Sequence, residues 1–531
     1  MAHRRQQPTA HWQRLIRSHL TSVTTQYNDP QTQSQSKNLD PAGAATEDAR
    51  RDKDMMNDGA AAKLLSGLTG LLLAVLLASA CLLHGQLVAK LDFDGELLPT
   101  DAEALYGLRC VREGRSPYHD FSRPPHVVAL YGPLFYAVPG TVARLLNTSW
   151  MGMVVTGRCY TYGAWFGVAA LIYALARQAG NARLPAMAGA LLWLSGALAP
   201  QWAIAYRPDS VAVLCSLAAL WVYQRGHGGA AVVLMGAAFL HKQTAVTLPL
   251  VVVATEIGRR RFGRAATIAA GWAVCVLAAV IATQRLSDGA FVKNAFGAVG
   301  QWAGPEQAWV LLQGAVWQGA VAFAAGALMC GDERLTLLRR CFAVSFALAL
   351  LSSAKAGAYV NYYLESYAIA CVLAAGFLAG GSHKRLRIGW LSLALVMSVN
   401  GLWSAARRFP EGWTQPAQEW DRLAACLGEL SDRVLVEDAY VAVRQSPALF
   451  ALHPRQLETL RQAGKFDDSA LLERISAGKL DAIIASFPFA VEGQNRQFPA
   501  RWLEAARGQY VLEKTCALPA RTLFVYRPAN R

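Results

Sequence analysis

Charged residues are scarce in this chain of 531 residues. Only 16% of the side chains are charged and 54% are hydrophobic, whereas roughly 25% of residues are charged in an ordinary soluble protein. This composition excludes a typical soluble globular protein. The net charge of +15 is concentrated in the apolar middle, because residues 64–403 carry 25 basic and 14 acidic side chains. Short basic clusters between hydrophobic runs are typical of cytoplasmic loops and do not indicate a nucleic-acid surface.

Cysteine pairs at metal-ligand spacing are absent. Most of the ten cysteines lie inside apolar runs, where a cysteine behaves as a small hydrophobe. A cysteine zinc site and a Cys-x-x-Cys redox motif are therefore excluded. Cys426 and Cys516 both fall in the polar C-terminal region, and we expect them to form a disulfide if that region lies outside the cytoplasm.

A cleavable signal peptide is also missing, because the first hydrophobic stretch begins only at Leu64 and ends near Leu83. That length is close to the ~20 residues that span a bilayer, so this stretch is predicted to be a signal anchor. Residues 1–60 are rich in Gln, Ser, Thr, Asn and Asp. We predict a disordered cytoplasmic leader there, because such a composition cannot bury enough surface to offset chain entropy. Met55 and Met56 offer an alternative start to Met1.

Ten more apolar runs follow this anchor. The predicted fold class is a polytopic α-helical membrane protein with about eleven transmembrane helices in residues 61–403. If the amino terminus is inside, the short cytoplasmic loops contain thirteen basic residues and the short outside loops only five, as the positive-inside rule requires. The ten runs lie near 158–176, 186–203, 209–224, 229–240, 244–257, 265–283, 308–330, 341–354, 366–380 and 388–403.

The side of the membrane on which the later loops lie depends on residues 229–257, which contain His241, Lys242 and Gln243 in their middle. A single continuous helix would place Lys242 near the bilayer centre, at a cost of about 3 kcal/mol. It would also invert all later loops. Two half-length helices that meet at these residues preserve the charge rule and place Lys242 in an outward-facing cavity. We therefore predict a helical hairpin.

After Trp403 the pattern changes to alternating helices and strands. An amphipathic run at 420–430 precedes the short β-type run 434–436, and helical patterns near 455–477 precede the run 482–484. Residues 510–513 and 522–526 are predicted to form a β-hairpin. Residues 404–531 therefore form a predicted small α/β domain, which eleven spans would place outside the cytoplasm.

The first outside loop, residues 90–157, contains half of the acidic residues of the membrane region. Thr100 and Glu103 have the spacing of a capping box, which gives Glu103 a structural explanation. Asp101 also suits the amino terminus of a helix. Asp92 and Asp94 follow the first span directly, where an ionised carboxylate can act as a general base.

The motifs of this region follow one another in a characteristic order, from the carboxylates through Gly114-Arg-Ser-Pro-Tyr-His-Asp-Phe to Tyr131-Gly-Pro-Leu-Phe-Tyr. Arg207-Pro-Asp, Phe239-Leu-His-Lys-Gln-Thr and Lys355-Ala-Gly-x-x-x-Asn-Tyr-Tyr-Leu-Glu come later. In this order the chain resembles the GT-C superfamily of membrane glycosyltransferases, and especially its protein O-mannosyltransferase and lipid A aminoarabinose transferase types. The resemblance covers roughly residues 64–403.

The resemblance implies that a sugar is transferred, with inversion, from a polyprenyl-phosphate donor to an acceptor hydroxyl on the outer face of the membrane. Such chemistry needs a base for the hydroxyl proton and cations for the leaving phosphate. Two candidates for the base stay open, because Asp94 fits the position after the first span and Asp101 fits the distance to Gly114. Further candidates for substrate binding are Asp92, Tyr131, Arg207, Asp209, Lys242, Lys355 and Glu365. Snorkelling at the interface explains the three cations equally well.

The predicted partners are a polyprenyl-phosphate-linked sugar, the membrane, and a lipid, glycan or protein acceptor. No nucleic acid is expected, no cofactor is certain, and a divalent cation is left open. The predicted location is the cytoplasmic (inner) membrane. The alternative is a polytopic transporter or lipid flippase, which would bury ionisable residues at several depths rather than at one face. No internal repeat is visible, which disfavours transporters built from duplicated halves.

Overall fold

The computed structural model describes residues 41–530, apart from 99, 197, 199, 299–300, 330–334, 381–383, 408–416, 447–448, 490–496 and 519–520. The chain divides into two compact units, Met1–Lys63 and Leu64–Arg531. Residues 1–40 of the predicted leader lie outside the described part. Residues 41–60 are helical rather than disordered, because they begin helix α2 (Pro41–Val88). Alanines and charged side chains with good helix propensity fill this segment and explain the difference.

Each predicted apolar run coincides with a helix over most of its described length, although the run 186–203 leaves α6 after Leu194. Among the described residues, six helical segments are long and apolar enough to cross a membrane: Ala62–Val88 of α2, α5 (Trp150–Gln178), α10 (Phe262–Leu286), α12 (Pro305–Leu328), α13 (Thr336–Ser353) and Val360–Ala379. Four apolar helices are shorter: α6 (Arg183–Leu194), α7 (Asp209–Gln224), α8 (Gly228–His241) and α9 (Thr247–Gly258). The last run lies in α15 (Lys384–Arg407). The structure therefore shows a multi-pass helical protein, and the count of eleven spans stays a prediction.

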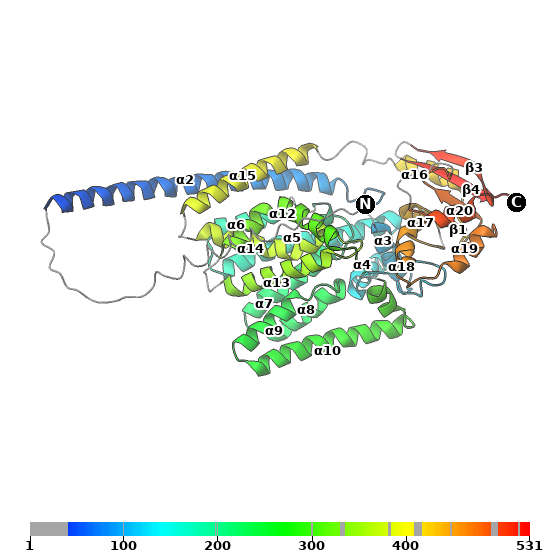
Figure 1. The fold of residues 1–531 in the computed structure, drawn as a ribbon, viewed down its shortest axis with the longest axis horizontal. Helices are drawn as coiled ribbons and strands as arrows, with labels where there is room; N and C mark the ends of the chain where they lie inside the picture. Colours follow the sequence, from blue (N-terminus) through cyan, green and yellow to red (C-terminus); the bar gives the residue numbers. More distant parts are fainter. Residues whose placement is uncertain are drawn as a thin grey trace, which may run out of the picture. The chain divides into compact units, whose positions relative to one another are not determined.

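Helix α14 (Leu364–Ala379) lies in the centre of the bundle. In the most apolar window of this span 83% of the residues are buried, against 17% in α10. Alanine, glycine and cysteine are frequent in α14, and such small residues allow neighbouring helices to approach closely. Helices α5, α6, α7, α12 and α13 pack around it. Helix α10 packs on α8 and α9 and runs along the outer side of the bundle (Figure 1).

The chain breaks between α8 and α9, as the predicted hairpin requires. Helix α8 ends at His241, and Lys242 has an extended backbone (φ −142°, ψ 116°). Helix α9 begins at Thr247. A continuous helix across Lys242 is therefore excluded, and Figure 1 shows the two short helices side by side, each packed on α10.

The first outside loop carries α3 (Asp101–Arg112) and α4 (Pro133–Leu145). Its apolar side chains, among them Leu105 and Leu108, share one buried core with Leu423, Val434 and Tyr440 of the C-terminal region. The loop and the C-terminal region therefore lie on the same side of the helical bundle.

The C-terminal region contains the predicted strands. The sheet has the order β1-β2-β4-β3, with β1 (Val434–Val436) parallel to β2 (Ala482–Ala485). Strands β3 (Tyr510–Ala517) and β4 (Thr522–Pro528) form the predicted antiparallel hairpin. Five helices accompany the strands: α16 (Ala417–Leu427), α17 (Ala439–Gln445), α18 (Pro454–Gln462), α19 (Ser469–Ser476) and α20 (Ala500–Ala506). The predicted disulfide between Cys426 and Cys516 is confirmed and joins α16 to β3.

Candidate active site

Arg158 of α5 holds the chain that leaves the first span. Its side chain is 1% exposed and donates hydrogen bonds to the carbonyl oxygens of Leu91 at 3.2 Å and Gly95 at 2.7 Å. It also donates to the carbonyl oxygen of Phe93. A guanidinium that binds several carbonyl groups at once gives a loop a defined path. This arginine therefore positions the carboxylates that follow the first span.

Asp94 is occupied by contacts with the C-terminal region. Its carboxylate pairs with Arg444, accepts a hydrogen bond from the Tyr440 hydroxyl at 2.9 Å and another from Trp150 Nε1 at 3.3 Å. Its backbone oxygen accepts from Trp420 Nε1 at 2.6 Å. With its oxygens bonded to cationic and neutral donors, this carboxylate joins the loop to the C-terminal region. Its role as the base stays a prediction.

Asp94→Asn should therefore lower the thermal unfolding midpoint of the purified protein by a few degrees, because Arg444 loses its charged partner in a partly buried setting. Breaking such a pair costs about 2 kcal/mol or more. The control is Asp92→Asn, since Asp92 is exposed and should leave the midpoint unchanged. Loss of activity in Asp94→Asn at an unchanged midpoint would contradict the anchoring role and favour Asp94 as the base.

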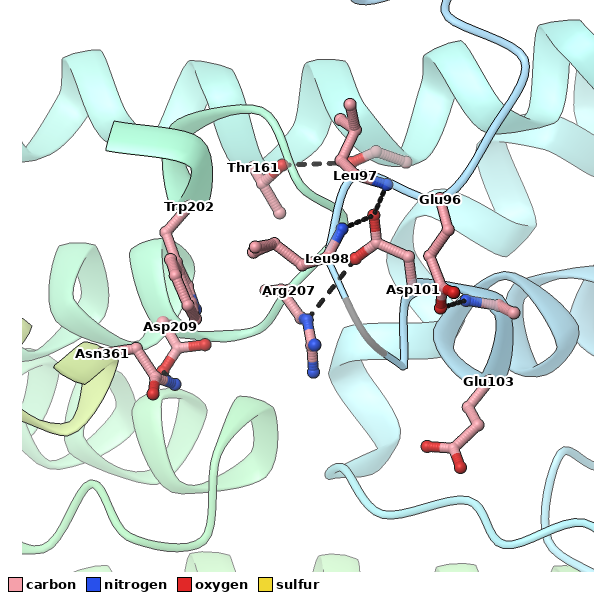
Figure 2. A network of polar contacts seen from close by, with 12 residues as sticks. Glu96, Leu97, Leu98, Asp101, Glu103, Thr161, Trp202, Arg207, Asp209 and Asn361 are labelled. Atoms are coloured by element: carbon pink, nitrogen blue, oxygen red, sulfur yellow. Dashed lines mark hydrogen bonds and ion pairs between the residues drawn. The ribbon is translucent and has the colours of Figure 1, made fainter. Parts of the chain in front are cut away.

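Asp101 is the other candidate for the base, and it faces Arg207. The residue is 1% exposed, and its Oδ1 lies 3.5 Å from Arg207 Nε (Figure 2). Its Oδ2 accepts hydrogen bonds from the backbone amides of Leu97 at 3.1 Å and Leu98 at 3.3 Å. Burial raises the pKa of Asp101, whereas Arg207 and the two amides oppose this effect. A carboxylate with a raised pKa is a stronger base than an exposed one.

The expected capping box at the start of α3 is not formed. Thr100 has a left-handed backbone (φ 74°) and its side chain makes no capping hydrogen bond. Glu96 takes this place, because its Oε1 accepts from the amide of Ala102 at 3.3 Å. The reason is that a left-handed residue does not direct its side chain to the first helical amides, whereas a capping residue usually has an extended backbone. Glu103 is thereby left without the structural role that its spacing suggested.

The Tyr131-Gly-Pro segment brings a tyrosine to the site through a close backbone approach. A Cβ atom on Gly132 would lie 2.1 Å from the carbonyl oxygen of Leu240, so only glycine allows this contact. The amide of Gly132 donates to the His241 oxygen at 3.3 Å. Tyr131 precedes this contact, and its hydroxyl accepts a hydrogen bond from Arg207.

The His241-Lys-Gln sequence at the helix break is bonded on three sides. The Tyr160 hydroxyl lies 2.7 Å from His241 Nε2, and Gln243 donates to the Leu130 oxygen at 3.0 Å. Lys242 pairs with Asp209 at the start of α7. These contacts hold the chain in place where the helix is interrupted. Polar groups at such a break need other partners, because the helical hydrogen bonds end there.

Asp209 and Lys242 line a small polar cavity. Its volume is about 40 Å³, which suits a few water-sized groups rather than a whole sugar. Asn361 donates to Asp209 at 2.8 Å, and Glu365 accepts from Thr247 at 2.8 Å. The cavity is lined by these residues and by Ala212, Val213, Ser216, Thr244, Ala245, Ser345, Leu348, Ala349, Ser352 and Tyr362.

The structure brings most of the predicted site residues together. Tyr131 and Asp209 lie within electrostatic reach of both Arg207 and Lys242. Arg207 in turn contacts Asp101. The acidic loop, the start of α7 and the helix break therefore converge on one region at one end of the bundle.

Three predicted residues are not part of this group: Asp94 contacts the C-terminal region instead, and no contact with the group is found for Lys355 or Asp92 in the described part of the chain. Lys355 follows α13, where its backbone pairs with Trp302, and it does not line the cavity. Asp92 is exposed. Of the three cations expected to converge, Arg207 and Lys242 pair with other predicted site residues. A part for Lys355 in the site stays a prediction.

The site also contains residues that the sequence patterns did not indicate. Glu96 lies beside Asp101, and Glu103 follows on the same helix with its carboxylate turned away from Asp101 (Figure 2). Only their place in the acidic segment could have pointed to them. His453 of the C-terminal region lies 3.8 Å from Glu103, and it belongs to none of the sequence motifs. Asn361 belongs to the quoted Lys355 motif but was not singled out. In the described part of the chain, no group of three or more His, Cys, Asp or Glu side chains is arranged to hold a metal ion.

Solved structures with the same fold exist. No family model and no curated protein matches the chain by sequence. The crystal structure of ArnT from Cupriavidus metallidurans in the apo state superposes with a TM-score of 0.58 at 14% identity, covering 88% of this chain and 98% of that one. The structure of the same ArnT bound to undecaprenyl phosphate gives a TM-score of 0.53 at 13% identity, covering 87% and 98%. The chain therefore has the same fold as ArnT.

Proposed function

We propose that this chain is an integral membrane glycosyltransferase that transfers a sugar from a polyprenyl-phosphate donor to an acceptor hydroxyl outside the cytoplasm. The observation that carries the proposal is the ion pair between the buried Asp101 and Arg207, which adjoins Lys242 and Asp209 at the end of the bundle that also contacts the C-terminal region. The fold supports it, since ArnT with this fold has been crystallised with undecaprenyl phosphate.

In this mechanism Asp101 is the general base. The acceptor hydroxyl attacks the anomeric carbon, the bond from that carbon to the phosphate oxygen breaks, and the polyprenyl phosphate leaves. The hydroxyl proton passes to the Asp101 carboxylate. Arg207 and Lys242 stabilise the negative charge that grows on the leaving phosphate, which is the largest electrostatic demand of the reaction. Attack on the side opposite the phosphate inverts the anomeric centre.

A transporter or lipid flippase remains the alternative function. Most of the buried charged side chains described above, from Asp101 to Glu365, gather at one end of the bundle, which disfavours a pathway with ionisable residues at several depths. The deciding experiment incubates purified protein in vesicles with a labelled polyprenyl-phosphate sugar and a hydroxyl-bearing glycolipid. A new glycosidic product together with free polyprenyl phosphate supports the transferase. Movement of intact labelled lipid between leaflets without a product supports the flippase.

We infer that the C-terminal region is extracytoplasmic. It contains the Cys426–Cys516 disulfide, and disulfides persist in oxidising compartments. It also shares a core with the first outside loop. This location agrees with transfer at the outer face of the cytoplasmic membrane, where the acceptor is a lipid, a glycan or a protein.

A fluorescent reporter that matures only in the cytoplasm should therefore stay dark when fused after Arg531. The matched control is a truncated fusion after Arg261, which lies in the predicted cytoplasmic loop between α9 and α10 and should fluoresce. Bright fluorescence of the full-length fusion would contradict both the extracytoplasmic location of the C-terminal region and the odd number of membrane spans.

A further inference from the structure

Glu103 is a buried carboxylate without a hydrogen-bond partner. It lies in the first turn of α3, two residues after Asp101, and is 3% exposed. Neither of its oxygens accepts or donates a hydrogen bond within the described part of the chain. Buried polar groups almost always have a partner, since leaving one unsatisfied costs free energy. An unsatisfied group at this position therefore points to a missing ligand.

His453 of the C-terminal region faces this carboxylate. Its Nε2 lies 3.8 Å from Glu103 Oε1 and is likewise without a hydrogen bond among the described residues. This distance is too long for a direct hydrogen bond. A single oxygen atom placed between the two groups can reach both of them at normal hydrogen-bond lengths of about 2.8 Å.

The backbone around His453 is held in an unusual conformation. The residue precedes α18 with φ 52° and ψ 71°, a left-handed geometry that is uncommon for residues other than glycine. The segment before it pairs with the first outside loop, because the amide of Leu452 donates to the His126 oxygen at 3.1 Å and the amide of His126 to the Phe450 oxygen at 2.8 Å. These bonds fix the imidazole against α3.

Burial disfavours the charged form of both groups. Burial raises the pKa of Glu103 well above its ordinary range, and Arg207 only partly opposes this shift. Burial, together with a smaller effect of the Arg207 charge, lowers the pKa of His453 to about 4. A carboxylic acid can donate a hydrogen bond and a neutral imidazole can accept one. Such a pair suits an uncharged hydroxyl rather than a phosphate.

We propose that Glu103 and His453 form a hydroxyl-binding subsite that holds a sugar hydroxyl on the side of α3 away from Asp101. The acid donates to the hydroxyl oxygen, and the hydroxyl donates to His453 Nε2. The proposal rests on the transferase function and extends it, because the C-terminal region then contributes a substrate-binding side chain to the site. The hydroxyl belongs either to the transferred sugar or to the acceptor, and the experiment separates these sources.

Four variants of the full-length protein test the subsite. His453→Gly removes the imidazole and suits the left-handed backbone. His453→Asn keeps a polar side chain that tolerates this backbone. Glu103→Leu has a similar volume without hydrogen-bonding atoms, whereas Glu103→Gln retains a neutral donor. The control is His227→Ala, since His227 is exposed. Thermal unfolding of each variant verifies that it is folded.

Two measurements are made on each variant. The first is the equilibrium affinity for a short-chain polyprenyl-phosphate pentose and for the bare polyprenyl phosphate. The second is the KM for an alkyl glycoside acceptor in the transfer assay. If the subsite holds the donor sugar, His453→Gly and Glu103→Leu weaken binding of the sugar-bearing lipid roughly three- to tenfold and leave the bare lipid unaffected. If it holds the acceptor, both affinities are unchanged and the acceptor KM rises by this factor.

Glu103→Gln should stay within about twofold of the wild type, because an amide can replace a neutral acid as donor. His453→Asn should recover part of the loss seen in His453→Gly. Unchanged affinities and KM in folded Glu103→Leu and His453→Gly would overturn the subsite. If the wild type transfers no sugar, the proposed function has failed, and the difference in lipid affinity alone decides whether the subsite exists.

Discussion

Asp101→Asn should reduce the turnover of sugar transfer by roughly 10²-fold or more, while the affinity for the donor survives. Asparagine preserves the shape of the side chain and can still accept from the amides of Leu97 and Leu98. It cannot take a proton from the acceptor hydroxyl. The measurement is kcat with a labelled polyprenyl-phosphate sugar under saturating donor, together with donor affinity at equilibrium.

The pH dependence of the wild type provides a second readout of the same role. The base must be ionised to act, and burial raises the pKa of Asp101. The rate should therefore be highest above this pKa and fall as the pH decreases through it. The Asp101→Asn variant should lose this limb of the profile.

The matched control for Asp101 is Asp92→Asn, because Asp92 belongs to the same loop but is exposed. Its turnover should equal that of the wild type. Full activity of Asp101→Asn would show that Asp101 is not the base. If folded Asp94→Asn loses turnover instead, the base is Asp94, and the contacts of Asp94 with Arg444 and Tyr440 must open during catalysis.

Arg207→Gln and Lys242→Gln should each weaken donor binding about 10- to 100-fold and lower turnover as well. Charge-assisted hydrogen bonds contribute about 1.5–3 kcal/mol each, and the leaving phosphate carries more negative charge in the transition state than in the donor. Equilibrium binding of the donor and kcat/KM for transfer measure the two effects separately.

Lys242 needs a control for its partner, because Lys242→Gln leaves the carboxylate of Asp209 buried at 4% side-chain exposure without its cation. The double variant Lys242→Gln with Asp209→Asn removes both charges and should restore stability but not donor affinity. Lys355→Gln should bind donor like the wild type, since Arg207 and Lys242, and not Lys355, pair with the carboxylates of the site. Wild-type donor affinity in both Arg207→Gln and Lys242→Gln would contradict the phosphate site and favour the transporter.

Several features of this protein follow from the sequence alone because they depend on short-range patterns. Hydrophobic runs marked every apolar helix, and the position of Lys242 marked the break between α8 and α9. Alternation and β-branched residues marked the strands that form the terminal hairpin. The polar location of Cys426 and Cys516 singled out the pair that forms the disulfide. The helices, the break and the strands depend on the hydrophobic period or on the cost of burying a charge, and both act over a few neighbouring residues.

The surroundings of the carboxylates were decided only by the tertiary structure. Spacing could not separate Asp94 from Asp101, because the difference lies in contacts with distant residues such as Arg444, which is 350 positions from Asp94. The capping box that spacing predicted for Glu103 failed because Thr100 has a left-handed backbone. His453 reaches Glu103 only because the C-terminal region packs on the first outside loop. Packing between segments far apart in the chain sets the partners and the burial of each carboxylate, and local patterns carry no information about either.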